Sequence, residues 1–87
     1  MPAAAAERIA DAIYLHPDDN ICVAARNLPK DHKLQIAGTS LTLGEAIRLG
    51  HKLAVRPIRK GEYVRKYGQI IGQATEPIEP GQWVHSH

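Results

Sequence analysis

The feature that most constrains the fold is a short phrase that recurs four times. Each copy has an aliphatic residue, two variable residues, a glycine or aspartate, two more variable residues, and then leucine or valine. The copies cover residues 28–34, 47–53, 58–64 and 78–84, with Asp31, Gly50, Gly61 and Gly81 in the central slot. Glycine reaches a positive φ at little cost and aspartate tolerates it, so each copy predicts a tight turn that starts a strand. The spacing between copies is irregular, which indicates a compact, mainly β domain and not a solenoid.

Alternating polar and apolar residues between these turns predict a series of short strands. The expected strands cover residues 12–15, 21–26, 33–37, 41–43, 52–56, 63–67, 69–74 and 83–87. Pro57 should end one strand or lie at an edge. Thr42 to Glu45 has the form of a capping box for a short helix, whereas the repeat makes the same region a turn. The sequence therefore allows one helical turn near 43–48, within a fold that holds at most one or two such turns.

Length and charge restrict the domain organisation and the partners. The chain of 87 residues is expected to form a flexible N-terminal tail over 1–10 and one domain over 11–87. The net charge of +2 and the pI of about 8.9 come from scattered basic residues, which argues against a nucleic-acid partner. No apolar run reaches the roughly 20 residues of a membrane span, which argues against a membrane partner.

The N-terminus and the single cysteine indicate where the protein works. Glu7, Arg8 and Asp11 interrupt the alanine-rich N-terminus, so it does not resemble a signal peptide. Cys22 lies in an apolar run and fits a buried thiol in a reducing compartment better than a nucleophile. The sequence thus predicts a cytoplasmic protein.

Strand alternation divides the residues after each turn into two sets. If each strand starts at the last residue of its copy, the core set is Leu53, Val55, Val64 and Val84. The opposite set is Arg56, Arg65, Tyr67, His85 and His87. An arginine can bind a carboxylate through two hydrogen bonds, so this polar set could line a binding surface for an anion. The alternative is a solvated sheet face, which is the simpler interpretation of Arg65.

His85 and His87 are two residues apart, so on a strand they point to the same side with Cα atoms roughly 6.5 Å apart. Two imidazoles in that arrangement can converge on a divalent metal, although a metal site needs further ligands. The alternative is a frayed, polar C-terminus. Asp18 and Asp19 form a carboxylate pair that turn chemistry explains more simply. Trp83, Tyr63 and Tyr14 are interpreted as packing residues.

Several motifs together resemble one family. They are Gly50-His-Lys-Leu-Ala-Val-Arg-Pro-Ile, Lys66-Tyr-Gly-Gln-Ile-Ile-Gly72, and the segment from Ile78 to the terminal His85-Ser-His87. They resemble the SAF domain of the altronate and galactarate dehydratases, a family that includes the sulfolactate sulfo-lyase. Two departures are Asp31, where relatives usually have glycine, and the end at His87, where relatives often continue with asparagine.

The resemblance implies a β-clip fold and the role of a small subunit or N-terminal domain of a sugar-acid hydro-lyase. It implies a large catalytic subunit or domain as partner, a sugar-acid substrate, and a divalent metal, iron or manganese, in the assembled enzyme. His51, Lys52, Arg56 and Tyr67 are then expected to bind substrate, and His85 and His87 to bind metal; no catalytic residue is assigned. A homo-oligomer is possible, and the isolated chain is expected to be inactive. The alternatives are a non-catalytic carbohydrate- or anion-binding module and the small subunit of a sulfolactate sulfo-lyase.

Overall fold

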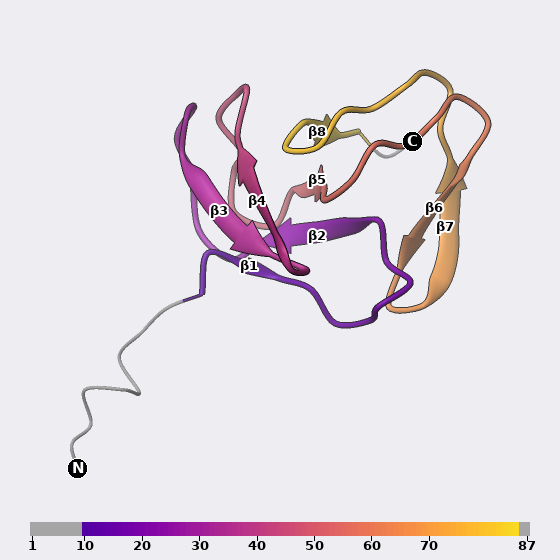
Figure 1. Ribbon diagram of the computed structural model, residues 1–87, viewed down its shortest axis with the longest axis horizontal. Coiled ribbons are helices and arrows are strands. Elements are labelled where there is room, and N and C mark those ends of the chain that lie inside the picture. Colours follow the sequence, from indigo (N-terminus) through magenta and orange to yellow (C-terminus); the bar gives the residue numbers. More distant parts are fainter. Residues whose placement is uncertain (1–9, 86–87) are drawn as a thin grey trace, which may run out of the picture.

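A computed structural model describes residues 10–85, which form eight strands in three antiparallel sheets (Figure 1). The central sheet has the order β1-β2-β5-β8, with bounds Ala12–Ile13, Ile21–Ala24, Lys52–Ala54 and Trp83–Val84. The other two sheets are hairpins: Lys33–Ile36 (β3) with Thr39–Thr42 (β4), and Tyr63–Lys66 (β6) with Gln69–Gln73 (β7). The mainly β prediction is confirmed.

Each hairpin closes a different face of the central sheet, as the two flanking hairpins in Figure 1 show. One core contains Leu34 and Leu41 of the first hairpin together with Leu53. The other contains Val64 of the second hairpin together with Ala54. Neighbouring residues of β5 therefore enter opposite cores, because side chains alternate along a strand. The central sheet is buried on both faces, which explains the unbroken apolar run of β2.

The four predicted turns are present, and each has its central residue at positive φ. The angles are 69° at Asp31, 84° at Gly50, 86° at Gly61 and 84° at Gly81. Each of these residues donates its N–H to a carbonyl of another segment at 2.8 Å, for example Gly61 to Ala74 and Gly81 to Ala54. The turns thus tie the strands together, and the prediction for Gly61 and Gly81 is confirmed.

The four copies are paired in space, so the second half of the chain repeats the first. Leu28 bridges to Ile47, and their counterparts Ile58 and Ile78 form the same bridge. The Asp31 N–H donates to the Leu43 carbonyl, and at the equivalent position the Gly61 N–H donates to the Ala74 carbonyl. The pair that starts at residues 58 and 78 is one residue longer than the pair that starts at 28 and 47, because the second hairpin holds one extra residue in a β-bulge.

The alternative helical turn near 43–48 does not form. The Ile47 N–H donates to the Leu28 carbonyl at 2.8 Å, and the Ile47 carbonyl accepts from the Leu28 N–H at 2.7 Å. Both backbone groups of Ile47 are therefore used in a long-range bridge. This pairing overrides the local capping pattern. Several strands are also shorter than predicted, and β4 begins at Thr39, earlier than expected. No helix in residues 10–85 is long and apolar enough to cross a membrane.

Candidate functional site

A cluster of three rings lies where β5 begins and β8 ends. His51 immediately precedes β5, and His85 immediately follows β8. The pairing of Lys52 with Val84 and of Leu53 with Trp83 places His51 and His85 across from each other, on the side of Trp83. The Trp83 ring stacks on His51 at 5.1 Å between centroids and 15° between planes. It also contacts His85 at 3.7 Å and 32°. We call these three residues the His-Trp-His cluster.

The position of Trp83 is fixed from two directions. Its side chain is half-buried and packs against the core that contains Leu53. Its backbone N–H donates to Glu45 Oε2 at 3.2 Å, which occupies a donor on the outer edge of β8. The indole therefore has a defined position, and both imidazole rings pack against it.

A cleft of about 240 Å³ adjoins the cluster. Trp83 and His85 line one side, and the end of β7 with the following loop lines the other. The polar side chains in its walls include Gln73, Glu76 and Gln82. An imidazole, a carboxylate and two amides beside an aromatic wall can bind a small polar ligand through hydrogen bonds.

The cluster contains two imidazoles, which are chemically suited to bind a divalent metal. Neutral imidazole binds divalent transition metals, and the rings of His51 and His85 both contact the Trp83 ring. Residues 10–85 contain no group of three or more histidine, cysteine, aspartate or glutamate side chains that could hold a metal ion. His87, the second predicted ligand, lies outside the described residues. Further ligands would have to come from His87, from a partner or from a substrate.

Arg56 and Tyr67 belong to a second group, centred on Asp19. Arg56 Nη2 donates to the backbone oxygens of Asp18 and Asp19, both at 3.0 Å. The Asp19 carboxylate is 2% exposed and accepts from the backbone N–H groups of Tyr67 and Gly68 at 2.8 and 2.7 Å. Asp19 therefore does more than form a local turn, since it anchors the tip of the distant β6–β7 hairpin.

Asn20 extends the same anchor along the edge of β6. Its Nδ2 donates to the Tyr63 carbonyl at 2.8 Å, and its Oδ1 accepts from the Arg65 N–H at 2.8 Å. A side-chain amide thus completes the hydrogen bonding of a strand edge. Together with Asp19 it fixes the hairpin to the central sheet.

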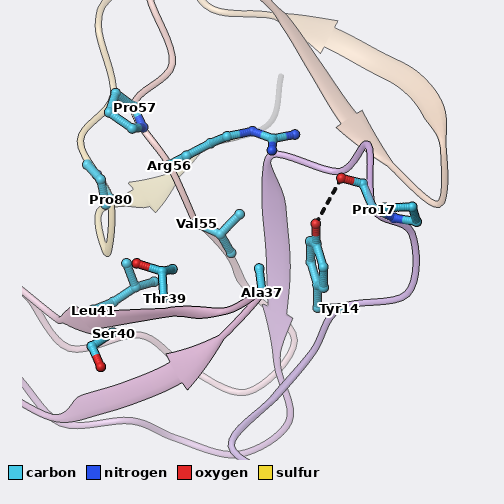
Figure 2. Close-up of a pocket in the computed structure, with 10 residues that line it drawn as sticks. All are labelled: Tyr14, Pro17, Ala37, Thr39, Ser40, Leu41, Val55, Arg56, Pro57 and Pro80. Carbon is cyan, nitrogen blue, oxygen red and sulfur yellow. Dashed lines mark hydrogen bonds between the residues drawn. The ribbon is translucent and has the colours of Figure 1, made fainter.

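A shallow groove of about 640 Å³ lies beside Arg56, between the first hairpin and the proline-rich loops (Figure 2). Tyr14, Val55, Pro57 and Pro80 supply much of its apolar wall. The Tyr14 hydroxyl donates to the Pro17 carbonyl at 3.0 Å, and the Arg56 side chain extends toward this end of the groove (Figure 2). Arg56 therefore has both a structural role at the Asp18–Asp19 turn and access to an apolar groove.

The structure divides the predicted polar surface between two places. His51 and Arg56 lie beyond opposite ends of β5, and five extended residues span roughly 16 Å. Lys52 follows His51 and points to the opposite face, where its ladder partners are Val23 and Val84. The core set Leu53, Val55, Val64 and Val84 is buried as predicted. The residues of β5 that alternate with this core set do not form a continuous solvated face, because Ala54 is buried in the second core.

Trp83 and Tyr14 pack against the first core as expected, whereas Tyr63 is exposed, so its predicted packing role is wrong. The contact of Trp83 with both histidines was not predicted from the sequence. The signal available was the spacing of Trp83 and His85, which places them on one side of a strand. The place of His51 beside them depends on the pairing of β5 with β8, and this pairing cannot be seen in the order of residues.

Residues 10–87 match a family described as the altronate/galactarate dehydratase SAF domain. Altronate dehydratase of Bacillus subtilis is 35% identical over 75 residues, which are 86% of this chain and 15% of that enzyme. Altronate dehydratase of Escherichia coli is 37% identical over 75 residues, with the same two shares. The (2R)-sulfolactate sulfo-lyase subunit alpha of Chromohalobacter salexigens is 44% identical over 43 residues, 49% of this chain and 46% of that subunit. The chain thus spans only a small part of the dehydratases it matches.

Proposed function

Because the chain belongs to the altronate/galactarate dehydratase SAF-domain family, we propose that it completes the active site of a sugar-acid hydro-lyase. It would do so as a small subunit or N-terminal domain, beside a larger catalytic part. The 15% share of the matched dehydratases supports this division, since most of each of those enzymes lies outside the matched segment.

The observation that carries the proposal is the His-Trp-His cluster beside its cleft. Trp83 holds two imidazoles on one side of the sheet, and the cleft adds the side chains of Gln73, Glu76 and Gln82. Hydrogen-bonding groups of this kind suit the hydroxyls and the carboxylate of a sugar acid. We therefore place the substrate contact at the cluster rather than at Arg56, whose guanidinium already binds the Asp18–Asp19 turn.

The proposed reaction removes water from a sugar acid. A base takes the proton alpha to the carboxylate, the hydroxyl on the neighbouring carbon leaves, and the two combine as water while a carbon–carbon double bond forms. The base would lie on the larger part. His51, His85 and His87 would hold a divalent metal, iron or manganese, which when bound stabilises negative charge on the substrate and on the leaving hydroxyl. Trp83 would keep the imidazoles oriented and cover one side of the site.

A chimera tests the proposal: the Bacillus subtilis altronate dehydratase with this chain in place of the 75-residue segment that it matches. In the chimera, His51→Ala, His85→Ala and the double change His85→Ala, His87→Ala should each lower altronate turnover, because each removes a proposed metal ligand. The double change should also lower the metal content measured by mass spectrometry. His16→Ala is the matched control, because His16 is a histidine outside the His-Trp-His cluster, and its ring accepts from the Asp18 N–H. Normal turnover and metal content in the double variant would rule the site out.

A second candidate function is the small subunit of a sulfo-lyase. It is favoured by the 44% identity to the Chromohalobacter salexigens subunit alpha, which is higher than the identity to either altronate dehydratase, although over a shorter segment. Comparing altronate with (2R)-sulfolactate as substrates of the enzyme assembled from this chain and its own larger part separates the two. Preference for (2R)-sulfolactate would select the second candidate.

A further inference from the structure

The second hairpin exposes a ridge of large apolar side chains. We call Tyr63, Tyr67, Ile70 and Ile71 the hairpin ridge; their exposed fractions are 49%, 52%, 51% and 45%. Strand β7 pairs only with β6 in the part of the chain that the structure describes, and all five of its residues are exposed. A cluster of exposed apolar side chains of this kind is typical of an interaction surface.

The internal repeat provides a control for this interpretation. Both hairpins turn through two residues at positive φ, Ala37-Gly38 and Tyr67-Gly68, so their positions correspond outward from the turn, with one extra residue in the second hairpin. By this correspondence Lys33, Ala37 and Ser40 of the first hairpin occupy the positions of Tyr63, Tyr67 and Ile70. The same fold unit therefore forms with small or polar residues there. The fold unit by itself therefore does not dictate apolar residues at these positions of the second hairpin.

The β-bulge adds to the ridge. Val64 pairs with Gly72 and Arg65 with Ile70, so Ile71 is the extra residue and has no counterpart in the first hairpin. Paired residues lie on the same face, so Ile70 lies with Arg65 on the side away from the buried Val64. The inserted Ile71 is exposed as well, so the bulge adds a second exposed isoleucine beside Ile70.

The charges around the ridge indicate what covers it. Arg65 pairs with Ile70 across the ladder, and Lys66 Nζ lies 4.8 Å from the centre of the Tyr67 ring. If two copies packed ridge to ridge about a two-fold axis, these cations would approach their own copies, which is unfavourable. An apolar patch with carboxylates at its rim would instead match both the isoleucines and the cations.

Resting on the proposed function, we propose that the hairpin ridge docks into an apolar, carboxylate-rimmed patch on the larger catalytic part of the hydro-lyase. The ridge has four residues, fewer than the roughly 20–30 residues a side of a standard stable interface, so it suits one part of a larger contact. Gln73, at the end of β7, lines the cleft that also contains His85.

The test measures assembly separately from turnover. The probe is the remainder of the Bacillus subtilis altronate dehydratase, expressed without the matched 75 residues and titrated with this chain in a calorimeter. In the triple change, Tyr63→Lys and Ile70→Ser introduce the residues of the first hairpin and Ile71→Ser makes the extra bulge residue polar; together they should raise the Kd at least tenfold. Arg65→Glu should weaken binding in the same direction. Leu49→Ser is the matched control, because Leu49 is 61% exposed but lies outside the hairpin.

Circular dichroism of each variant checks that the fold persists, as the first hairpin leads us to expect. An unchanged Kd for the triple variant would overturn the proposal, and so would a failure of the unsubstituted chain to bind. A dimer of the chain alone that the triple change abolishes in sedimentation would assign the ridge to a second copy and overturn it too. Loss of turnover in His51→Ala together with an unaffected Kd in the triple variant would leave the proposed function standing and remove only this inference.

Discussion

Replacing two turn glycines by alanine separates backbone strain from steric contact. Gly61 and Gly81 occupy the same slot of the repeat at φ values of 86° and 84°. Alanine at positive φ costs about 1–2 kcal/mol at either position. An added Cβ at Gly61 meets nothing within 4 Å, whereas at Gly81 it would lie 2.9 Å from the carbonyl oxygen of Thr42. We therefore expect Gly61→Ala to cost about 1–2 kcal/mol and Gly81→Ala about 3 kcal/mol or more, because backbone must also move.

Urea unfolding measures both changes. The single tryptophan, Trp83, provides the fluorescence signal, and circular dichroism provides a second signal that does not depend on the neighbourhood of residue 81. Gly61→Asp is the control, because Asp31 occupies the same slot at φ 69° and aspartate tolerates this region better than alanine. It should cost less than Gly61→Ala. Equal losses for the two alanine variants would refute the steric argument, and losses below about 0.3 kcal/mol in both would refute the need for positive φ.

Three further predictions concern single side chains. Asp19→Ala removes both acceptors for the Tyr67 and Gly68 N–H groups and should lower the free energy of unfolding by about 3 kcal/mol, with Asp19→Asn intermediate. Hydrogen exchange of the backbone amides of residues 63–73 should then become faster, and unchanged exchange would contradict the role of Asp19 as an anchor. The pKa of Asp11 is lowered, chiefly by its hydrogen bond from His32 and also by Arg26, so its contribution to stability is present above about pH 4 and is lost as pH falls through the lowered pKa. Asp11→Asn should make the free energy of unfolding depend less on pH in the acid range. The control Asp18→Asn, at an exposed side chain, should leave that pH dependence unchanged. Burial raises the pKa of Cys22 to about 12, so a thiol reagent at pH 8 should label it only after unfolding; rapid labelling of the folded chain would show that the thiol is accessible.

The turns could be predicted from the sequence because their cause is local. Positive φ selects glycine or aspartate, and the flanking aliphatic residues recur at fixed offsets, so Asp31, Gly50, Gly61 and Gly81 were identified without any knowledge of the fold. The core set that begins at Leu53 was also predictable, because side chains alternate along a strand.

The partners of these turns could not be predicted, because they depend on contacts between distant segments. The bridge of Leu28 with Ile47 decides against a helical turn, and nothing in residues 43–48 alone indicates it. Asp19 resembles an ordinary turn residue, yet its carboxylate binds a hairpin tip 48 positions away. His51 joins Trp83 and His85 only through the register of β5 with β8.

Restoration of activity tests the central claim, that this chain completes an active site on a larger part, most directly. Altronate turnover is measured for this chain alone, for the Bacillus subtilis dehydratase without its matched segment, and for the chimera that carries this chain in its place. We predict turnover by the chimera, its loss on His51→Ala or His85→Ala, and none by the chain or the truncated enzyme alone. Full turnover by the truncated enzyme, or turnover by the isolated 87-residue chain, would contradict the claim.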